Sequence, residues 1–181
     1  MALSASVFKV NVQLSDMDRH HYFTYSLTLA KHPSETSERM MARLLAFLRY
    51  ADDRLVFTRG LSETDEPDLW MKDRTGQPEL WIEVGLPTAK RIVWSSRQSQ
   101  KVVVFAYGRN VAPWWKKNRQ EMEKVGNLEL VVLPVDLTES LAKRVSRTWQ
   151  CLIQDNVMSL IGETASYELD FGSCTRLGAG L

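Results

Sequence analysis

The sequence predicts a mixed α/β domain in which antiparallel hairpins accompany one βαβ crossover, and three observations lead to this prediction. The segment VFKVNVQL near the N-terminus alternates apolar and polar residues, as half-buried strands do. A long helix pattern with one apolar stripe lies downstream of it. Near the middle of the chain, the uninterrupted apolar run KVVVFAY is typical of a strand that is buried on both faces.

Length and composition fit one globular domain. The chain has 181 residues, of which 44% are hydrophobic and 25% charged, so we expect residues 1–181 to form a single domain. A net charge of +1 gives no whole-molecule argument for a nucleic acid or a membrane. The two cysteines are too few for a disulfide framework and have no zinc spacing. With no membrane span and no signal peptide in the sequence, we expect a cytoplasmic protein without a membrane partner.

The first third of the chain predicts a hairpin followed by a helix. Val7 to Leu14 and Tyr22 to Leu29 are the two strands. The helix is expected to start at Pro33 and Ser34, and its apolar stripe consists of Met41, Leu44, Leu45 and Leu48. Glu38 lies at the edge of this stripe. It is either an acid that complements the helix dipole or a side chain that reaches into a site.

A second hairpin places two acids together. Leu69 to Lys72 and Glu79 to Val84 are its strands, and the segment DRTGQP supplies the turn. Asp68 is expected on the same face as Trp70 and Lys72, with Trp70 and Trp81 as cross-strand partners. Closure of the hairpin brings Asp68 near Glu83 at its open end. Two carboxylates that meet there repel each other unless a proton or a cation lies between them.

The remaining elements follow the second hairpin. A helix starting at Pro87 and a strand from Val102 to Tyr107 complete a parallel, right-handed βαβ unit with the strand of Glu83. In that helix we expect a buried face made of Ala89, Ile92, Val93 and Ser96, and a second stripe made of Arg91, Ser95 and Gln98. Further elements are a helix ended by Gly126, a strand over Leu128 to Pro134, a helix opened by Thr138, and strands over Thr148–Ile153, Val157–Ile161 and Ser166–Phe171.

Charge is segregated along the middle of the chain. Residues 52–83 contain nine acids and four bases, whereas residues 84–120 contain eight bases and no acid. A site that binds a cation beside a polyanion needs such an arrangement, although chance also produces it.

The order of these elements resembles the PD-(D/E)xK nuclease core. In that core an acid of the hairpin and a second acid bind magnesium, and a helical glutamate supports the site. Pro67 and Asp68 form a literal P-D pair, and the next acid, Glu83, follows fifteen residues later. The resemblance implies Mg²⁺ or Mn²⁺ bound by Asp68 and Glu83, with Glu66 as the alternative hairpin acid and Glu38 as the helical glutamate.

The sequence departs from this pattern at the lysine. Gly85 stands two residues after Glu83, where the pattern has lysine. Lys90 or Arg91 of the following helix is the candidate replacement. Lys90 is the better base because arginine stays protonated, and Arg91 shares its stripe with Gln98.

Taken whole, the chain resembles the bacterial YaeQ family. The segments that carry this resemblance are SLTLAKHPSETSERMMARLLAFLRYADDRLVFTRGL (Ser26–Leu61), DEPDLW (Asp65–Trp70), LWIEVGLP (Leu80–Pro87) and FAYGRNVAPWW (Phe105–Trp115). It implies an α/β roll of the restriction-endonuclease-like type, with a mixed sheet and additional antiparallel strands. The site residues that it implies are Glu38 with its neighbour Glu35, Asp68 or Glu66, Glu83, Lys90 or Arg91, and Gln98.

Three functions stay open from the sequence. The first is a metal-dependent phosphodiesterase that acts on nucleic acid. The second is a non-catalytic binding module on the same scaffold, in which Glu83 pairs with Arg91 or Gln98. The third is a protein-interaction role for the surface near Trp114, although Trp114 and Trp115 are also expected to split between the core and its edge.

Overall fold

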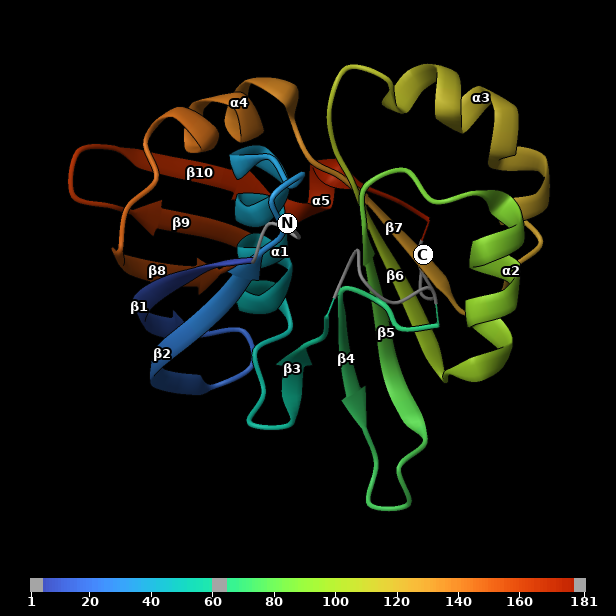
Figure 1. The fold of residues 1–181 in the computed structure, drawn as a ribbon, viewed down its shortest axis with the longest axis horizontal. Coiled ribbons are helices and arrows are strands. Elements are labelled where there is room, and N and C mark those ends of the chain that lie inside the picture. Colours follow the sequence, from blue (N-terminus) through green and yellow to red (C-terminus); the bar gives the residue numbers. More distant parts are fainter. Residues whose placement is uncertain (1–4, 60–64, 178–181) are drawn as a thin grey trace.

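Two mixed sheets and five helices make up the fold in the described ranges, residues 5–59 and 65–177 of this computed structural model (Figure 1). The first sheet has the strand order β10-β9-β8-β1-β2. Its strands are β1 (Ser6–Asp16), β2 (His21–Lys31), β8 (Thr148–Gln154), β9 (Val157–Ile161) and β10 (Ser166–Asp170). The predicted N-terminal hairpin and the three C-terminal strands are therefore confirmed, and β1 joins them by pairing in parallel with β8.

The second sheet has the order β11-β7-β6-β5-β4-β3. Its strands are β3 (Leu55–Phe57), β4 (Leu69–Lys72), β5 (Pro78–Val84), β6 (Lys101–Ala106), β7 (Leu128–Val132) and β11 (Thr175–Leu177). The helices are α1 (Ser37–Arg49), α2 (Ala89–Gln98), α3 (Val111–Met122), α4 (Val135–Lys143) and α5 (Phe171–Cys174). The β4–β5 hairpin and the parallel pair β5–β6 agree with the prediction.

Helix α1 lies between the two sheets (Figure 1). All residues from Met40 to Leu48 are buried, so the helix is covered on every side, although its sequence shows a single apolar stripe. It begins at Ser37, later than the predicted start, because the Thr36 hydroxyl caps it by accepting from the Arg39 N–H at 3.1 Å. One buried core therefore joins α1 to the inner faces of both sheets.

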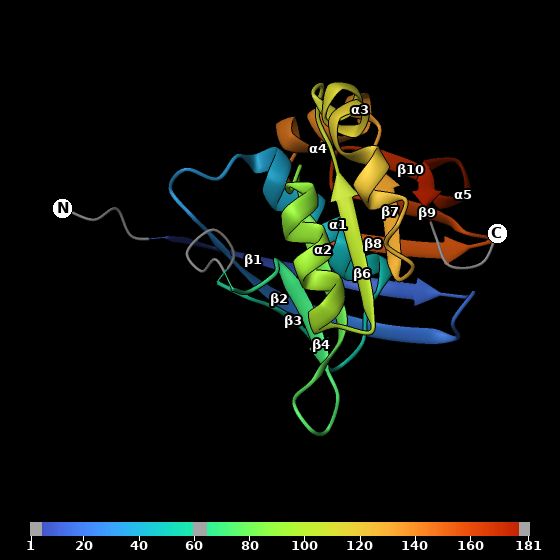
Figure 2. The same ribbon diagram turned by 90° about the vertical axis from the view of Figure 1, so that its right-hand side faces the viewer.

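Helices α2 and α3 cover the outer face of the second sheet (Figure 2). Strands β6 and β7 pair in parallel, so β6-α3-β7 is a second crossover. The sequence predicts only the first, β5-α2-β6. Helix α2 begins at Ala89 because Thr88 caps it, two residues after the predicted start at Pro87. Its buried residues are Ala89, Ile92 and Ser95, so the predicted burial of Val93 and Ser96 is wrong. Within the described residues, no helix is long and apolar enough to span a membrane.

Helix α4 opens at Val135, three residues before the predicted opening at Thr138. Pro134 stands at its N-cap, and the Thr138 side chain points into the protein instead of capping the helix. Its hydroxyl hydrogen-bonds Glu38 of α1, at 2.6 Å, and the Val135 carbonyl. The threonine thus joins two helices, a role that local sequence does not reveal.

Candidate functional site

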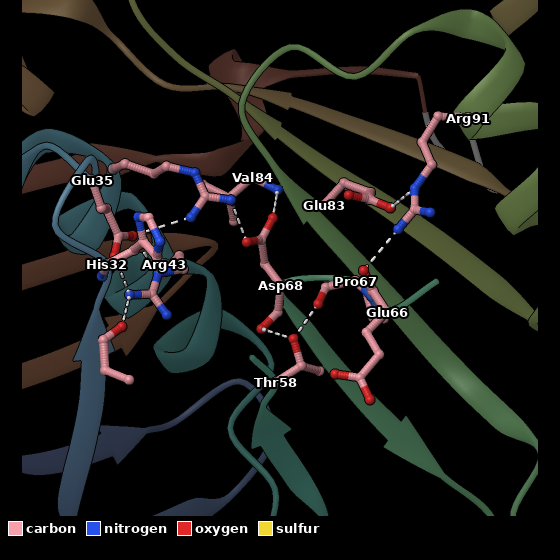
Figure 3. A network of polar contacts seen from close by, with 12 residues as sticks. His32, Glu35, Arg43, Thr58, Glu66, Pro67, Asp68, Glu83, Val84 and Arg91 are labelled. Atoms are coloured by element: carbon pink, nitrogen blue, oxygen red, sulfur yellow. Dashed lines mark hydrogen bonds and ion pairs between the residues drawn. The ribbon is translucent and has the colours of Figure 1, made fainter. Parts of the chain in front are cut away.

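The open end of the β4–β5 hairpin brings Asp68 and Glu83 together, as predicted (Figure 3). Leu69 pairs with Ile82 across the two strands, so Asp68 and Glu83 are the next residues on the two sides. The Asp68 N–H donates to the Ile82 carbonyl at 2.9 Å and extends the pairing by one step. Both acids are buried, with exposed fractions of 3% and 9%. Their charges therefore need partners inside the protein.

Asp68 is held from the inner face of the sheet. One carboxylate oxygen accepts the Val84 N–H at 2.7 Å, and the other accepts a hydrogen bond from the Arg39 guanidinium of α1. The predicted face shared with Trp70 and Lys72 is therefore wrong for this side chain. Asp68 precedes the first residue of β4, where strand alternation no longer fixes its direction, and the cation on α1 attracts it.

Glu35 anchors the arginines behind Asp68. Its carboxylate accepts two hydrogen bonds from Arg43, each at 2.8 Å, and one from Arg39 at 3.1 Å. Arg43 is 2% exposed and also donates to the Ala30 carbonyl at 2.9 Å. Burial opposes the charge of Arg39, but Asp68 and Glu35 outweigh it and raise its pKa. On the inner side of the site, a continuous series of ion pairs with alternating charge therefore runs from Arg43 through Glu35 and Arg39 to Asp68.

Glu83 is held from the outer face. Its carboxylate accepts the Trp81 indole N–H at 2.8 Å and the Arg91 Nε–H at 2.7 Å. Arg91, in the first turn of α2, also donates to the backbone carbonyl of Glu66 at 2.7 Å. The Glu66 side chain itself points away from Glu83 (Figure 3). Arg91 thus connects α2 to both sides of the hairpin end.

The pKa of Glu83 is raised above its ordinary value. Burial is the largest cause, and the negative charge of Asp68 adds to it. The hydrogen bonds from Trp81 and Arg91 act in the opposite direction without cancelling the effect. Glu83 and Asp68 are therefore coupled electrostatically, as expected for two neighbouring carboxylates.

Three other predicted residues lie apart from this pair. Glu38 lies on α1 but accepts from Thr138 of α4 at 2.6 Å. Lys90 is exposed on α2, and Gln98 is exposed at the far end of that helix. Of the two candidates to replace the lysine, Arg91 is the residue that contacts Glu83, and the choice between Lys90 and Arg91 stays a prediction. The structure thus brings together Asp68, Glu83 and Arg91.

Sequence reasoning missed Arg39 and Arg43 as site residues. A signal was present, because Glu35, Arg39 and Arg43 recur every four residues, the spacing of ion-paired side chains on one helix face. Tyr107, directly after β6, was also missed. Burial raises its pKa, while the charge of Arg39 and a hydrogen bond with Thr36 oppose that effect.

Comparison with known proteins identifies the family. A family model described as "YaeQ protein" matches residues 1–171. The chain belongs to the YaeQ family. YaeQ of Escherichia coli (strain K12) is 41% identical over 173 residues, which cover 94% of this chain and 96% of that protein.

Two crystal structures of YaeQ proteins match closely. That from Xanthomonas axonopodis pv. citri has a TM-score of 0.90 and 43% identity, covering 97% of this chain and 99% of that one. That from Pseudomonas syringae has a TM-score of 0.86 and 36% identity, covering 91% and 92%. The two-sheet arrangement is therefore shared with other YaeQ proteins.

Gly85 ends β5 in a conformation that disfavours lysine. Its φ is +121°, a region that residues with a Cβ rarely adopt, and its N–H donates to the Phe105 carbonyl at 2.9 Å. A Cβ there would meet nothing within 4 Å, so the obstacle is the backbone conformation and not space. In this YaeQ chain, the position at which the PD-(D/E)xK pattern has lysine thus has a backbone conformation that favours glycine.

The acids match one part of a metal site. Carboxylate oxygens are the ligands that Mg²⁺ prefers, and Mg²⁺ commonly uses one or two carboxylates and takes its other ligands from water and substrate phosphates. Asp68 and Glu83 can supply this set in the YaeQ chain. Across residues 5–59 and 65–177, no group of three or more His, Cys, Asp or Glu side chains is placed to hold a metal. A metal ion held by Asp68 and Glu83 would therefore need its remaining ligands from water or substrate.

Other predicted features of the YaeQ chain play structural roles. Trp70 and Trp81 are cross-strand partners, with ring centroids 5.9 Å apart. Cys151 and Cys174 are free, buried thiols. Trp114 and Trp115 are both half-buried and pack against the outer core, so the expected split between core and edge is wrong.

Proposed function

We propose that this YaeQ-family chain is a divalent-metal-dependent phosphodiesterase that acts on nucleic acid through a variant PD-(D/E)xK site. The α1, β4–β5, α2 and β6 segments would form the corresponding restriction-endonuclease-like core. The observation that supports the proposal most is the pairing of two buried neighbouring carboxylates with two arginines from different helices. Such a group offers ligands for a cation and donors for a phosphate within one site.

Asp68 and Glu83 are the residues that would hold Mg²⁺ or Mn²⁺. When bound, the ion polarises a phosphate oxygen and lowers the pKa of a water molecule. Arg39 would support the site from α1 by holding Asp68, whereas Glu38, the predicted helical glutamate, is turned to Thr138. Lys90 is exposed beside Arg91 in the first turn of α2 and would contact the phosphate. Arg91 stays protonated and would bind the phosphate, for which the planar guanidinium is well suited.

The ion pairs indicate how substrate binding starts. Arg39 and Arg91 neutralise the two acids in the free protein. A phosphodiester offers Arg91, the more exposed of the two arginines, an alternative anion, and its movement to the phosphate would leave Glu83 free for the cation while Arg39 stays paired with Asp68. We therefore expect the metal and the nucleic acid to bind together, each with higher affinity when the other is present.

Cleavage assays with matched variants test the proposal. We expect the protein with Mg²⁺ or Mn²⁺ to nick supercoiled plasmid or to cut single-stranded DNA or RNA, and both Asp68→Asn and Glu83→Gln to abolish this activity. Glu79→Gln is the control, because Glu79 lies in the same strand but pairs with Arg54 at the surface. Absence of cleavage on all three substrates, or equal cleavage by Glu83→Gln, contradicts the proposal.

A non-catalytic nucleic-acid-binding module is the second candidate. It is favoured by the +121° φ of Gly85 and by the Glu83–Arg91 ion pair, in which the acid serves as an anchor. In this case Glu83→Gln leaves nucleic-acid affinity unchanged or raises it, because Arg91 is released toward phosphate. Measuring the affinity of the wild-type protein and of Glu83→Gln with and without Mg²⁺ separates the two candidates, because only in the first does Mg²⁺ raise the affinity of the wild-type protein and not that of the variant.

A further inference from the structure

Helix α2 carries an exposed face of basic, aromatic and amide side chains that the proposed chemistry does not fully use. We call this face, made of Lys90, Trp94, Arg97 and Gln98, the α2 platform. The four residues recur at spacings of three and four, so they lie on one side of the helix, and all four are exposed. Trp94 is the largest of them and has an exposed fraction of 38%.

Trp94 contacts residues of the outer half of the candidate site. Its ring meets that of Trp81 edge-on, with centroids 5.5 Å apart. The Arg91 guanidinium lies 5.1 Å from the Trp94 ring centroid and 5.4 Å from that of Trp81, while it also bonds Glu83. An indole held this way presents a flat surface next to Arg91, the residue that bonds Glu83.

The charge around the platform is suited to a polyanion. Residues 84–120, which include all of α2, contain no acid. On the β4 side, Lys72 lies 3.5 Å from the Trp70 ring centroid. On the α3 side, Arg97 borders a hollow of about 420 Å³ in which the acid Glu121 is accompanied by the base Lys124. The acids of the neighbouring strand β5 are ion-paired, Glu79 with Arg54 and Glu83 with Arg91, so the further charges of Lys72, Lys90 and Arg97 make the surroundings of Trp94 basic.

We infer that the α2 platform binds single-stranded nucleic acid by stacking an unpaired base on Trp94 and placing the adjacent phosphates on Lys90 and Arg97. Base stacking on an aromatic side chain needs an accessible base face, which a duplex hides within its own stack. From Lys90 to Gln98 the helix rises about 12 Å, which matches roughly three stacked nucleotides. A strand on this face leads toward Glu83.

This inference names the substrate class of the proposed site and therefore rests on the proposed function, but its test does not depend on cleavage. The experiment measures binding of a fluorescent twelve-nucleotide single strand and of its duplex by anisotropy, without a metal, in the folded 181-residue chain. The variants are Trp94→Ala, Trp94→Phe and, as control, Tyr22→Ala. Tyr22 is a 58% exposed aromatic residue of β2 in the other sheet.

We expect Trp94→Ala to weaken binding of the single strand about tenfold. Trp94→Phe should restore most of the affinity, and Tyr22→Ala should change nothing. Duplex binding should be weaker and insensitive to Trp94. Equal losses for single strand and duplex, an unchanged affinity in Trp94→Ala, or no binding of the single strand by the wild-type protein overturns the inference. If binding depends on Trp94 but the protein cleaves no substrate, the α2 platform is supported and only the proposed phosphodiesterase activity is contradicted.

Discussion

Asp68 and Glu83 are neighbours across one hairpin, but their ion pairs belong to different parts of the molecule. The Arg39–Asp68 pair has side-chain exposures of 14% and 4% and continues through Glu35 to Arg43, where both side chains are 2% exposed. The Arg91–Glu83 pair, at 23% and 12%, lies on the outer face beside an exposed tryptophan. The first pair is thus tied to the core and the second to the surface.

The two ion pairs therefore have different roles: the inner one stabilises the fold, and the outer one can exchange its carboxylate for another anion. A buried arginine that loses its carboxylate has no water to replace it, so the inner series of ion pairs must stay intact for the protein to fold. Arg91 reaches solvent and is therefore able to leave Glu83 for another anion at lower cost. The comparison predicts that changes on the inner side act mainly on stability, whereas changes on the outer side act on stability less and on ligand binding more.

The largest effect is expected from Glu35→Ala. This change leaves Arg43 buried without its carboxylate, and we expect the free energy of unfolding to fall by about 3–5 kcal/mol. Chemical denaturation measures it, with Glu79→Ala as the control. Glu79 pairs with Arg54 at side-chain exposures of 29% and 50%, so its removal should cost at most about 1 kcal/mol. Equal losses in the two variants would show that the inner series of ion pairs is not a structural support.

A smaller, pH-dependent effect is expected from Arg91→Met. The pKa of Glu83 in the folded protein is raised above its ordinary value of 4.5. The folded state therefore binds this proton more tightly than the unfolded state, which adds to the free energy of unfolding below pH 4.5. This added stability is lost as the pH rises through the folded-state pKa. Removing Arg91 raises that pKa further. The variant should therefore lose about 1–3 kcal/mol of stability at pH 7.5 and clearly less at pH 4.5.

Urea denaturation at the two pH values checks the Arg91→Met prediction. The double variant Arg91→Met with Glu83→Gln is the control, because it has no carboxylate left to titrate at this position. Its stability relative to Glu83→Gln should not change between the two pH values. A loss in Arg91→Met that is as large at pH 4.5 as at pH 7.5 would mean that the ionisation of Glu83 is not its cause.

The smallest effect is expected from Gly85→Ala. A Cβ at φ +121° strains the backbone and should lower the free energy of unfolding by about 1–2 kcal/mol, although the space is open. Gly126→Ala is the matched control, since Gly126 is also open but is not among the glycines with positive φ. Thermal denaturation compares the two. Equal stability of both variants would show that a lysine at position 85 is tolerated and that the backbone does not explain its absence.

Local patterns predicted most of the elements. The alternation of VFKVNVQL located the first strand, the turn segment DRTGQP located the second hairpin, and the apolar run KVVVFAY located β6, because these patterns follow from turn chemistry and from which strand faces are buried. Helix starts were less accurate. Pro33, Pro87 and Thr138 are residues that favour helix starts, but Thr36, Thr88 and Pro134 occupy the N-caps. Several residues of similar preference stand close together there, and packing decides among them.

The sequence by itself determined that Asp68 and Glu83 meet, because a hairpin with a defined turn fixes which residues face each other at its open end. It also determined the basic character of α2, since charge is a property of composition. The single domain, the metal and the nucleic acid stay predictions.

Only the tertiary structure decided which cations neutralise the two acids. Arg39 reaches Asp68 because α1 is placed between two sheets, and Arg91 reaches Glu83 because α2 packs on the opposite face. Glu38, equally well placed along the sequence, turns to Thr138 of α4 instead. Contacts between elements that are distant in sequence depend on how helices pack against sheets, and neither periodicity nor spacing within one element encodes that packing.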